Sequence, residues 1–480
     1  MNKRNRIHVS WLIAWSSLGI LIGTYLSLYT TRFSGLEYLF MAFCLSVVSL
    51  IRKDYIAVIL MIIVGLLVGL WRGGNQVLSQ RGFESYYNKE VVLSGKVRDD
   101  PSLDSEGDLR FILVDVVVDN HNQSGTVWVA TNTDLQIKRS DNIEVQGKLT
   151  KGFGTIPAAI FKARVQMIER QDFVDVGRET RDWFASGIRR SIIEPEASLG
   201  TGFLLGQKTE LPEKLDQELR LLGLTHIVVA SGYNLTILVR FARRFFSKIS
   251  RFSALSLSGF LIFGFAQLTG FSPSMVRASL ITSLSLLAWY YGRKIHPLVL
   301  LPFSAAVTVV INPVYAWGDI GWLLSFASFV GVIMLSPLIH SYFWGDKKPN
   351  SIRQVFIETM SAQILALPII IFVFNQYSPL SLLANVLILP LIPIAMALIM
   401  FAGIGGLSLG SLAVFVGKPA EIILRYMTTI VDKLAVLPKA QSEINITINT
   451  LIIGYIAIFT GMIYLWRRTG LEFREYNIIE

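Results

Sequence analysis

The sequence lacks most of the residues on which catalysis or covalent stabilisation depends. It has one cysteine, Cys44, inside an apolar segment, so disulfides and thiolate metal sites are not expected. Its five histidines are scattered without the spacing of a metal site, and it contains neither a Walker loop nor a Gly-x-Ser-x-Gly elbow. We therefore expect no metal, no cofactor and no catalytic residues.

Charged residues are also scarce. Only 16% of the 480 residues are charged and 52% are hydrophobic, a composition typical of an integral membrane protein. The formal net charge of +10 fits positive loops on one membrane face and need not imply an anionic partner. The first apolar run, after MNKRNRIHVS, is long enough to span a bilayer and has no obvious cleavage site, so we expect a retained anchor.

Apolar runs predict a polytopic α-helical membrane protein with about 11–12 spans, some of them broken. The predicted spans are 10–30, 36–51, 55–71, 224–242, 252–270, 274–291, 297–312, 319–343, 353–374, 380–405, 408–437 and 450–466. If the chain crosses at each of them, its basic loops fall on one side, which places the N-terminus in the cytoplasm. The span 408–437 has a charged face, so it is expected to lie in the interface or to line a pore.

The sequence divides into five parts. They are N-terminal transmembrane helices (1–75), a small all-β domain (82–170), amphipathic or interfacial helices (176–222), a second transmembrane domain (223–470) and a cytoplasmic tail (471–480). Residues 82–170 contain short β-branched runs separated by turn residues. These runs predict an OB-like barrel of about five strands, which is extracytoplasmic in this topology.

The β domain contains aromatic residues that could serve a single-stranded ligand. Phe111, Trp128 and Phe153 could be stacking platforms for bases, or they could fill the barrel core; we favour the core. The domain has 11 Lys or Arg and 13 Asp or Glu between Gly82 and Arg170. Strong electrostatic attraction to nucleic acid is therefore not expected there.

The segment from Gly223 to Val239 combines an apolar span with polar or flexible residues, among them His226, Ser231, Gly232 and Asn234. Burying hydrogen-bonding groups in hydrocarbon is costly unless they face protein or water. In a helix, His226 and Asn234 share a face, and Gly232 allows the helix to bend. The segment therefore either lines a pathway or joins helices by hydrogen bonds, and the sequence leaves both alternatives open.

Other polar residues within the predicted spans are few. Arg277 and Asp319 have complementary charges and could form an ion pair, although both lie near span ends and could reach the interface instead. Gln267, Gln363 and Asn385 are the neutral members of this set. Prolines at four positions predict broken helices around a cavity: Pro368, Pro379, Pro390 and Pro393.

These motifs, taken in order, resemble the ComEC competence family of inner-membrane DNA uptake channels. LLGQKTELPEKLDQELRLLGLTHIVVASGYNLTILV is similar to the family's core motif. TGFSPSMVRASL resembles its Ser-Pro-x-x-x-Arg-Ala span, and WGDIGWLLSF its Asp-x-Gly-x-x-Leu-Ser-Phe span. SAQILALP and LLANVLILP resemble its Ala-Gln and Leu-Ala-Asn segments. The resemblance covers about residues 180–405 and, more loosely, the N-terminal spans and the β domain.

The resemblance implies a competence-type channel domain at 223–470 that passes one DNA strand across the bacterial cytoplasmic membrane. The residues that match family motifs, and are thereby implied in the channel, are His226, Ser231, Gly232, Arg277, Asp319, Gln363 and Asn385. Asn234 joins this set, although relatives usually have a histidine there, and asparagine does not titrate near neutral pH. Leu323 replaces a common glutamine. Many relatives carry a C-terminal metallo-β-lactamase-like domain, which is not expected here because the sequence stops about fourteen residues after the last predicted span.

The leading hypothesis is a non-enzymatic channel for single-stranded DNA in natural transformation. The implied partners are single-stranded DNA, an external DNA receptor, a cytoplasmic helicase-like ATPase, a separate nuclease for the other strand, and membrane lipids. The alternative is a transporter of another anionic substrate, such as a lipid head group or an oligosaccharide. A membrane enzyme that uses Ser231 or His226 is a third hypothesis.

Overall fold

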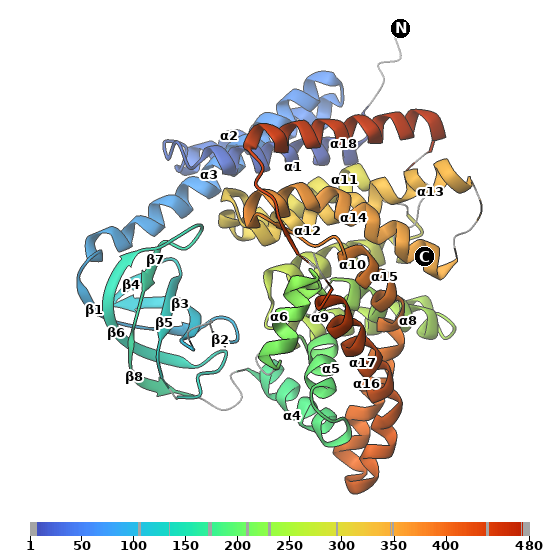
Figure 1. Ribbon diagram of the computed structural model, residues 1–480. Coiled ribbons are helices and arrows are strands. Elements are labelled where there is room, and N and C mark those ends of the chain that lie inside the picture. The colour runs from blue at the N-terminus through green and yellow to red at the C-terminus, as the bar shows by residue number, and fades with distance from the viewer. Residues whose placement is uncertain are drawn as a thin grey trace. The chain divides into compact units, whose positions relative to one another are not determined.

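The computed structural model is mostly helical and carries one β domain (Figure 1). It describes residues 7–103, 107–133, 135–170, 175–207, 211–228, 232–293, 296–345, 347, 350–437, 441–471 and 473. The chain forms two compact units, Met1–Val176 with Leu298–Trp322, and Gly177–Pro297 with Leu323–Glu480. The predicted fold class, a polytopic helical membrane protein with an inserted OB-like domain, is confirmed.

Glycines bring two long helices of the first unit into backbone contact. The unit begins with α1 (Val9–Leu26), α2 (Leu36–Arg52), α3 (Tyr55–Gln80) and η1 (Arg81–Tyr86). A Cβ on Gly65 of α3 would overlap the carbonyl oxygen of Ser16, and a Cβ on Gly23 of α1 would overlap that of Leu66. Helices in a bilayer usually contact each other through small residues, because lipid covers large apolar side chains as well as another helix does.

Hydrogen bonds hold two shorter elements, α11 (Pro297–Ile311) and η2 (Pro313–Trp317), against α1 and α3. The Arg72 guanidinium of α3 donates to the carbonyl oxygens of Val310 at 2.9 Å and Ile311 at 3.1 Å. These carbonyls lie at the end of α11, where the helix itself supplies no donors. The Trp317 indole donates to the carbonyl oxygen of Thr24 in α1 at 2.9 Å.

The sheet of the β domain closes on itself. Its strands are β1 (Glu90–Val97), β2 (Ser102–Leu103), β3 (Leu109–Val118), β4 (His121–Gln123), β5 (Val127–Thr131), β6 (Asn142–Lys151), β7 (Ala158–Ile160) and β8 (Arg164–Glu169). The order β1-β3-β5-β7-β6 returns to β1 through the β1–β6 pair, and β5 and β7 are parallel. Five strands thus form an OB-like barrel, to which β2, β4 and β8 are added. Its core includes Phe83, Leu93, Leu113, Val129 and Val145.

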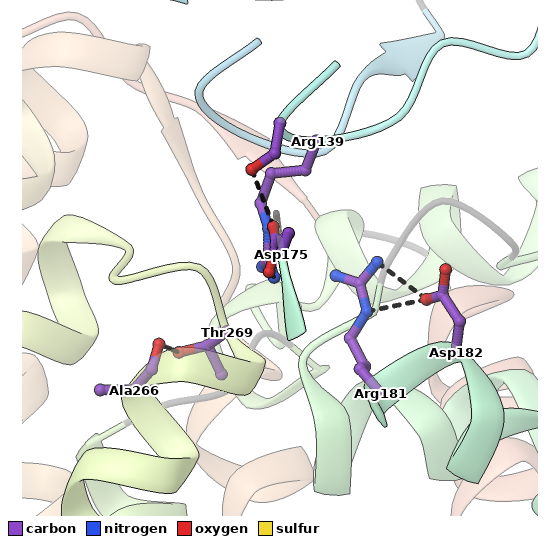
Figure 2. A network of polar contacts seen from close by, with 7 residues as sticks. Arg139, Asp175, Arg181, Asp182, Ala266 and Thr269 are labelled. Atoms are coloured by element: carbon purple, nitrogen blue, oxygen red, sulfur yellow. Dashed lines mark hydrogen bonds and ion pairs between the residues drawn. The ribbon is translucent and has the colours of Figure 1, made fainter. Parts of the chain in front are cut away.

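Ion pairs hold the chain where it leaves the barrel. Asp141, whose side chain is fully buried, accepts hydrogen bonds from Arg170 at 2.6 and 2.9 Å. Arg139 donates two hydrogen bonds to Asp175, at 2.7 and 2.9 Å. Figure 2 shows these two residues side by side. Two-point pairs between arginine and carboxylate are stronger and more directional than neutral hydrogen bonds. Arg139 and Asp141 therefore hold Asp175 and Arg170 beside the barrel.

From α4 onward, apart from α11 and η2, the elements belong mainly to the second unit. They are α4 (Val176–Ser191), α5 (Glu196–Leu205), α6 (Glu213–Leu221), α7 (Thr225–Val228), α8 (Gly232–Phe246), α9 (Arg251–Leu268), α10 (Pro273–Tyr290), α12 (Ile320–Val330), η3 (Gly331–Leu335), α13 (Ser336–Trp344), α14 (Ser351–Phe374), β9 (Gln376–Tyr377), α15 (Ser381–Ile388), η4 (Leu389–Leu391), α16 (Ile392–Ser408), η5 (Gly410–Leu412), α17 (Ala413–Ala435), β10 (Ser442–Glu443) and α18 (Ile448–Thr469). The largest core packs α4–α6 against α15–α17 and includes Ile188, Leu199, Leu222, Ile392 and Leu424.

Charged residues of α17, which belongs to the segment assigned from the sequence to the interface or a pore, pair with one another and with neighbouring helices. Glu421 is buried and accepts a hydrogen bond from Arg425 at 2.8 Å. Arg425 also contacts Glu196 of α5 at 3.5 Å, and Asp432 accepts from Lys214 of α6 at 2.8 Å. These contacts attach the charged face of α17 to α5 and α6.

A π turn interrupts the predicted span 319–343. It is η3, which joins α12 to α13. Gly331 permits a close contact with α14, because a Cβ there would overlap the carbonyl oxygen of Ser361. After the turn, His340 is buried and its ring stacks on Trp344 with centroids 6.0 Å apart. Single π turns in helices often occur at functional positions.

Seven of the described helical segments are long and apolar enough to cross a membrane. They are Val9–Leu26, Tyr55–Tyr86, Arg251–Leu268, Ile320–Trp344, Arg353–Phe374, Ser381–Ser408 and Ile448–Thr469. Several other predicted spans correspond to shorter helices, such as α2 with 17 residues and α11 with 15. Short and broken helices therefore account for much of the difference from the larger number of predicted spans.

Replacing Gly65 with alanine should lower the free energy of unfolding by about 1–3 kcal/mol, because the new methyl group must separate α1 from α3. Thermal unfolding of the purified protein in detergent measures the effect. Gly454→Ala on α18 is the matched control: apart from its chain neighbours and the adjacent backbone of α18 itself, no described atom lies within 4 Å of a Cβ there. That variant should be as stable as the wild type or slightly more so. Equal unfolding of both variants would contradict the glycine contact.

Candidate functional site

The described residues of the Gly223–Val239 segment include α7 and the start of α8. His226 belongs to the short helix α7, and Asn234 to α8, which begins at Gly232. That these two residues share one helical face stays a prediction, because the structure does not describe residues 229–231, which lie between them. Ser231, between them, lies outside the described residues.

Asn234 closes the end of another helix. Its side chain is fully buried, and its Nδ2 donates to the carbonyl oxygen of Phe203 at 3.0 Å. Phe203 lies in the last turn of α5, which ends at Gly206 in the left-handed conformation with φ 73°. Carbonyls at this end of a helix lack helical donors. The contact links α5 to α8 and supports the helix-joining alternative for Asn234.

Gly232 marks the place where α8, α10 and α12 come together. A Cβ on Gly232 would lie 2.8 Å from the Cβ of Ala278 in α10 and 3.8 Å from the ring of Phe329 in α12. Arg277, next to Ala278, is 2% exposed, so the predicted cation is inside the protein. Phe329 was missed in the sequence; the available signal is its spacing of three residues from Phe326, whose ring it meets edge to face.

Gln363 of α14 and Asn385 of α15 meet at Ser381. Gln363 Nε2 donates to Ser381 Oγ at 3.0 Å, and Asn385 Nδ2 donates to the carbonyl oxygen of Ser381 at 2.8 Å. Gly223 adjoins the same hydroxyl, since a Cβ on it would lie 3.2 Å from Ser381 Oγ. The carbonyl oxygen of Gly223 is 2.9 Å from Nδ1 of His226. The structure thus brings two predicted residues, Gln363 and Asn385, into one polar cluster at Ser381, and His226 adjoins it through Gly223.

This polar cluster keeps unused hydrogen-bonding capacity. Asn385 is 1% exposed, and its Oδ1 has no hydrogen-bond partner among the described residues. A buried acceptor without a partner costs about 1–3 kcal/mol, so the position suits a hydrogen-bond donor brought by a ligand or by water. Ser381 was missed from the sequence, although it lies four residues before Asn385 on the same helical face.

Asp319, in the first unit, caps a helix. Its Oδ1 accepts a hydrogen bond from the Trp322 backbone N–H at 2.6 Å, which is the usual N-cap contact at the start of a helix such as α12. The Trp322 indole donates to Thr308 Oγ1 of α11 at 2.9 Å. The ion pair predicted with Arg277 would join residues of different units, and it stays a prediction.

Chemically, these residues provide neutral donors and acceptors together with a buried cation, Arg277. Such groups can exchange hydrogen bonds with a polar molecule that passes them. Across the part of the chain that the structure describes, no three His, Cys, Asp or Glu side chains are grouped as a metal ion would require.

The three aromatic residues predicted in the β domain separate into two groups. Phe111 is 4% exposed and belongs to the barrel core, so it cannot stack on a ligand. Trp128 is only partly buried, and its ring contacts those of Phe153 and Phe161 at 5.3 and 5.2 Å between centroids. The Arg110 guanidinium lies 5.6 Å from the Trp128 ring.

This outer cluster occupies the surface on which OB barrels bind their ligands. Trp128 and Arg110 are on β5 and β3, the third and second barrel strands, and Phe153 is on the connection from β6 to β7. Phe153 and Phe161 are each about half exposed. The face of the second and third strands, with the adjoining loops, is the OB binding surface.

Together, the fold and the polar helix breaks define a polytopic membrane protein. The chain belongs to the competence protein family, whose model matches residues 203–469, and this confirms the resemblance found in the sequence.

Two relatives match comparable lengths of the chain. ComE operon protein 3 of Bacillus subtilis (strain 168) is 25% identical over 205 residues, which are 42% of this chain and 25% of that protein. An uncharacterized protein of Aquifex aeolicus (strain VF5) is 26% identical over 200 residues, 41% of this chain and 45% of the relative. The chain therefore matches less than half the length of either relative. No solved structure matches.

Replacing Asn234 with leucine should lower the free energy of unfolding by about 1–3 kcal/mol, because the Phe203 carbonyl loses a buried donor. The measurement is thermal unfolding in detergent. Asn445→Leu, at an exposed asparagine of the same unit, is the control and should unfold as the wild type does. An unchanged unfolding temperature for Asn234→Leu would show that this contact does not hold α5 to α8.

Proposed function

We propose that this protein passes one strand of DNA through the bacterial cytoplasmic membrane during DNA uptake. The observation that carries the proposal is the competence family match over residues 203–469, the part of the chain in which polar side chains meet at helix breaks. A polyanion cannot cross hydrocarbon, so it needs a path lined by polar groups and broken helices.

The Gln363–Ser381–Asn385 cluster is our candidate for the neutral part of this path. Its amides and hydroxyl bind one another, so a strand can exchange hydrogen bonds with them without leaving a charge unpaired. His226 adjoins the cluster through Gly223 and adds a ring nitrogen. Neutral hydrogen-bonding groups suit passage, because a ligand that binds weakly at several sites can also leave.

Positive charge supports an anionic substrate. The stretch between Glu218 and Asp319 contains nine Lys or Arg residues and no Asp or Glu. Arg277 lies within it and is buried in the second unit. Because a charge at membrane depth is costly, an ionisable side chain there is taken by default as a candidate functional residue. The same argument supports the alternative, a transporter of another anionic substrate.

The outer face of the β domain is our candidate for first contact with the strand. Trp128, Phe153 and Phe161 offer ring faces, and Arg110 adds a positive charge beside them. Stacking on aromatic rings is tolerant of base sequence, which suits uptake of any DNA. Because the domain as a whole is nearly neutral, this surface would bind the strand as a local patch.

Partners follow from the proposed transport. The sequence has no Walker loop, so the energy is expected to come from a cytoplasmic helicase-like ATPase. An external receptor would deliver DNA to the β domain, and a separate nuclease would remove the other strand. These partners, like the placement of the N-terminus in the cytoplasm and of the β domain outside, belong to the proposal.

Replacing Arg277 with glutamine should reduce uptake of fluorescent DNA by about tenfold or more, because a phosphate then loses a buried cation worth at least about 1.4 kcal/mol. Uptake is measured in a strain that lacks this gene and is complemented with each variant, with membrane levels compared by immunoblot. Arg293→Gln removes an exposed cation and is the matched control.

Normal uptake by Arg277→Gln at wild-type levels would remove Arg277 from the path. Unchanged uptake in the deletion strain, with no other uptake route present, would mean that DNA is not the substrate and would favour the anion-transporter alternative.

Replacing Phe153 with alanine should weaken binding of a single-stranded oligothymidine to the full-length protein by about tenfold, because one base loses a stacking partner worth about 1–3 kcal/mol. Fluorescence anisotropy in nanodiscs measures the affinity. Phe153→Tyr keeps the ring and should bind as the wild type does. Leu103→Ala, at another exposed apolar side chain of the domain, is the control, and an equal loss there would argue against stacking.

A further inference from the structure

The connection between α8 and α9 concentrates positive charge without an acidic counterpart in the neighbouring sequence. The nearest acidic residues along the chain are Glu218 and Asp319. We name residues 241–252 the α8–α9 turn. Its cations are Arg243, Arg244, Lys248 and Arg251.

Three of these cations are available to an external anion. Arg244, Lys248 and Arg251 are exposed, and none of them forms an ion pair with a residue that the structure describes. Arg244 lies in the last turn of α8, where the helix dipole favours a cation. Arg251 is the first residue of α9, where the dipole disfavours one. Helix stability therefore does not account for the charge at Arg251.

The remaining contacts hold the turn in place. The Arg243 guanidinium lies 5.4 Å from the centre of the Trp289 ring on α10. Ser250 caps α9 by accepting a hydrogen bond from the backbone N–H of Ser253 at 2.9 Å. The exposed cations are thus carried by a segment that is fixed at both ends.

Large apolar side chains occupy the same turn. Phe241, Phe245, Ile249 and Phe252 are each more than half exposed, and the rings of Phe241 and Phe245 stack at 6.4 Å. Exposed apolar groups of this size need a non-aqueous cover. Helix α9, which starts in the turn, is one of the helices apolar enough to cross a membrane. Cations next to aromatic side chains at the end of a span fit the head-group layer of a bilayer.

We propose that the α8–α9 turn binds the phosphate head groups of anionic phospholipids. The phenylalanines and Ile249 enter the acyl region, while Arg244, Lys248 and Arg251 bind the phosphates of adjacent lipids. A nucleic-acid strand would match the charge, but it would leave Ile249 in water. The lipid satisfies the charge and the apolar surface together.

The test titrates the full-length protein in detergent with phosphatidylglycerol and counts the bound lipids by native mass spectrometry. R244Q/K248Q/R251Q should bind this lipid about 100-fold more weakly than the wild type, because each basic residue near an anionic lipid surface contributes about fivefold. Phosphatidylcholine should bind equally to both proteins. Equal unfolding temperatures in phosphatidylcholine nanodiscs establish that the variant is folded.

Two control variants separate the site from general charge. K89Q/K148Q/R164Q removes three exposed cations of the β domain and should bind phosphatidylglycerol as the wild type does. R244K/R251K keeps the charge and should also bind normally. Equal phosphatidylglycerol binding by the wild type and R244Q/K248Q/R251Q overturns the proposal. Loss of oligothymidine binding by that variant, with lipid binding unchanged, overturns it in favour of a nucleic-acid surface.

Discussion

Inside a bilayer, every backbone N–H and C=O that a helix leaves open has to find a partner within the protein, and this requirement shapes both units. Where α5 ends, Asn234 reaches the carbonyl oxygen of Phe203, and where α11 ends, Arg72 reaches two carbonyls. Where α12 begins, Asp319 accepts the N–H of Trp322. These polar side chains are therefore needed by the helix ends themselves. A pathway for a substrate has to use positions where the backbone groups of the helix ends already have partners.

The sequence predicts the helical membrane fold and the barrel because apolar runs of span length and short β-branched runs have few other structures open to them. It does not predict the contacts that position the helices, since these contacts join segments that are distant in the sequence. The contact of Gly65 with Ser16 is of this kind. So are the pairs that Glu421 and Arg425 form at the contact with α5. That the charged face of α17 lies in the interface or lines a pore stays a prediction.

The candidate site was partly visible in the sequence because polar groups stand out in apolar spans. Its centre was not, because Ser381 is a residue type that many spans contain, and only the fold places it between Gln363 and Asn385. In the barrel, Phe111 and Trp128 are both aromatic residues of strands. Side chains alternate between the two faces of a strand, so register alone puts Phe111 inside and Trp128 outside.

The π turn at Gly331–Leu335 changes the direction in which the following side chains point around the axis of this membrane span. One residue more than an α-helical turn rotates everything after it by about 100° relative to an unbroken helix. Phe329, before the turn, and His340, after it, therefore face directions that a helical wheel drawn for one continuous span would assign wrongly. A single crossing presents two differently oriented surfaces, and their mutual angle is set by one additional residue.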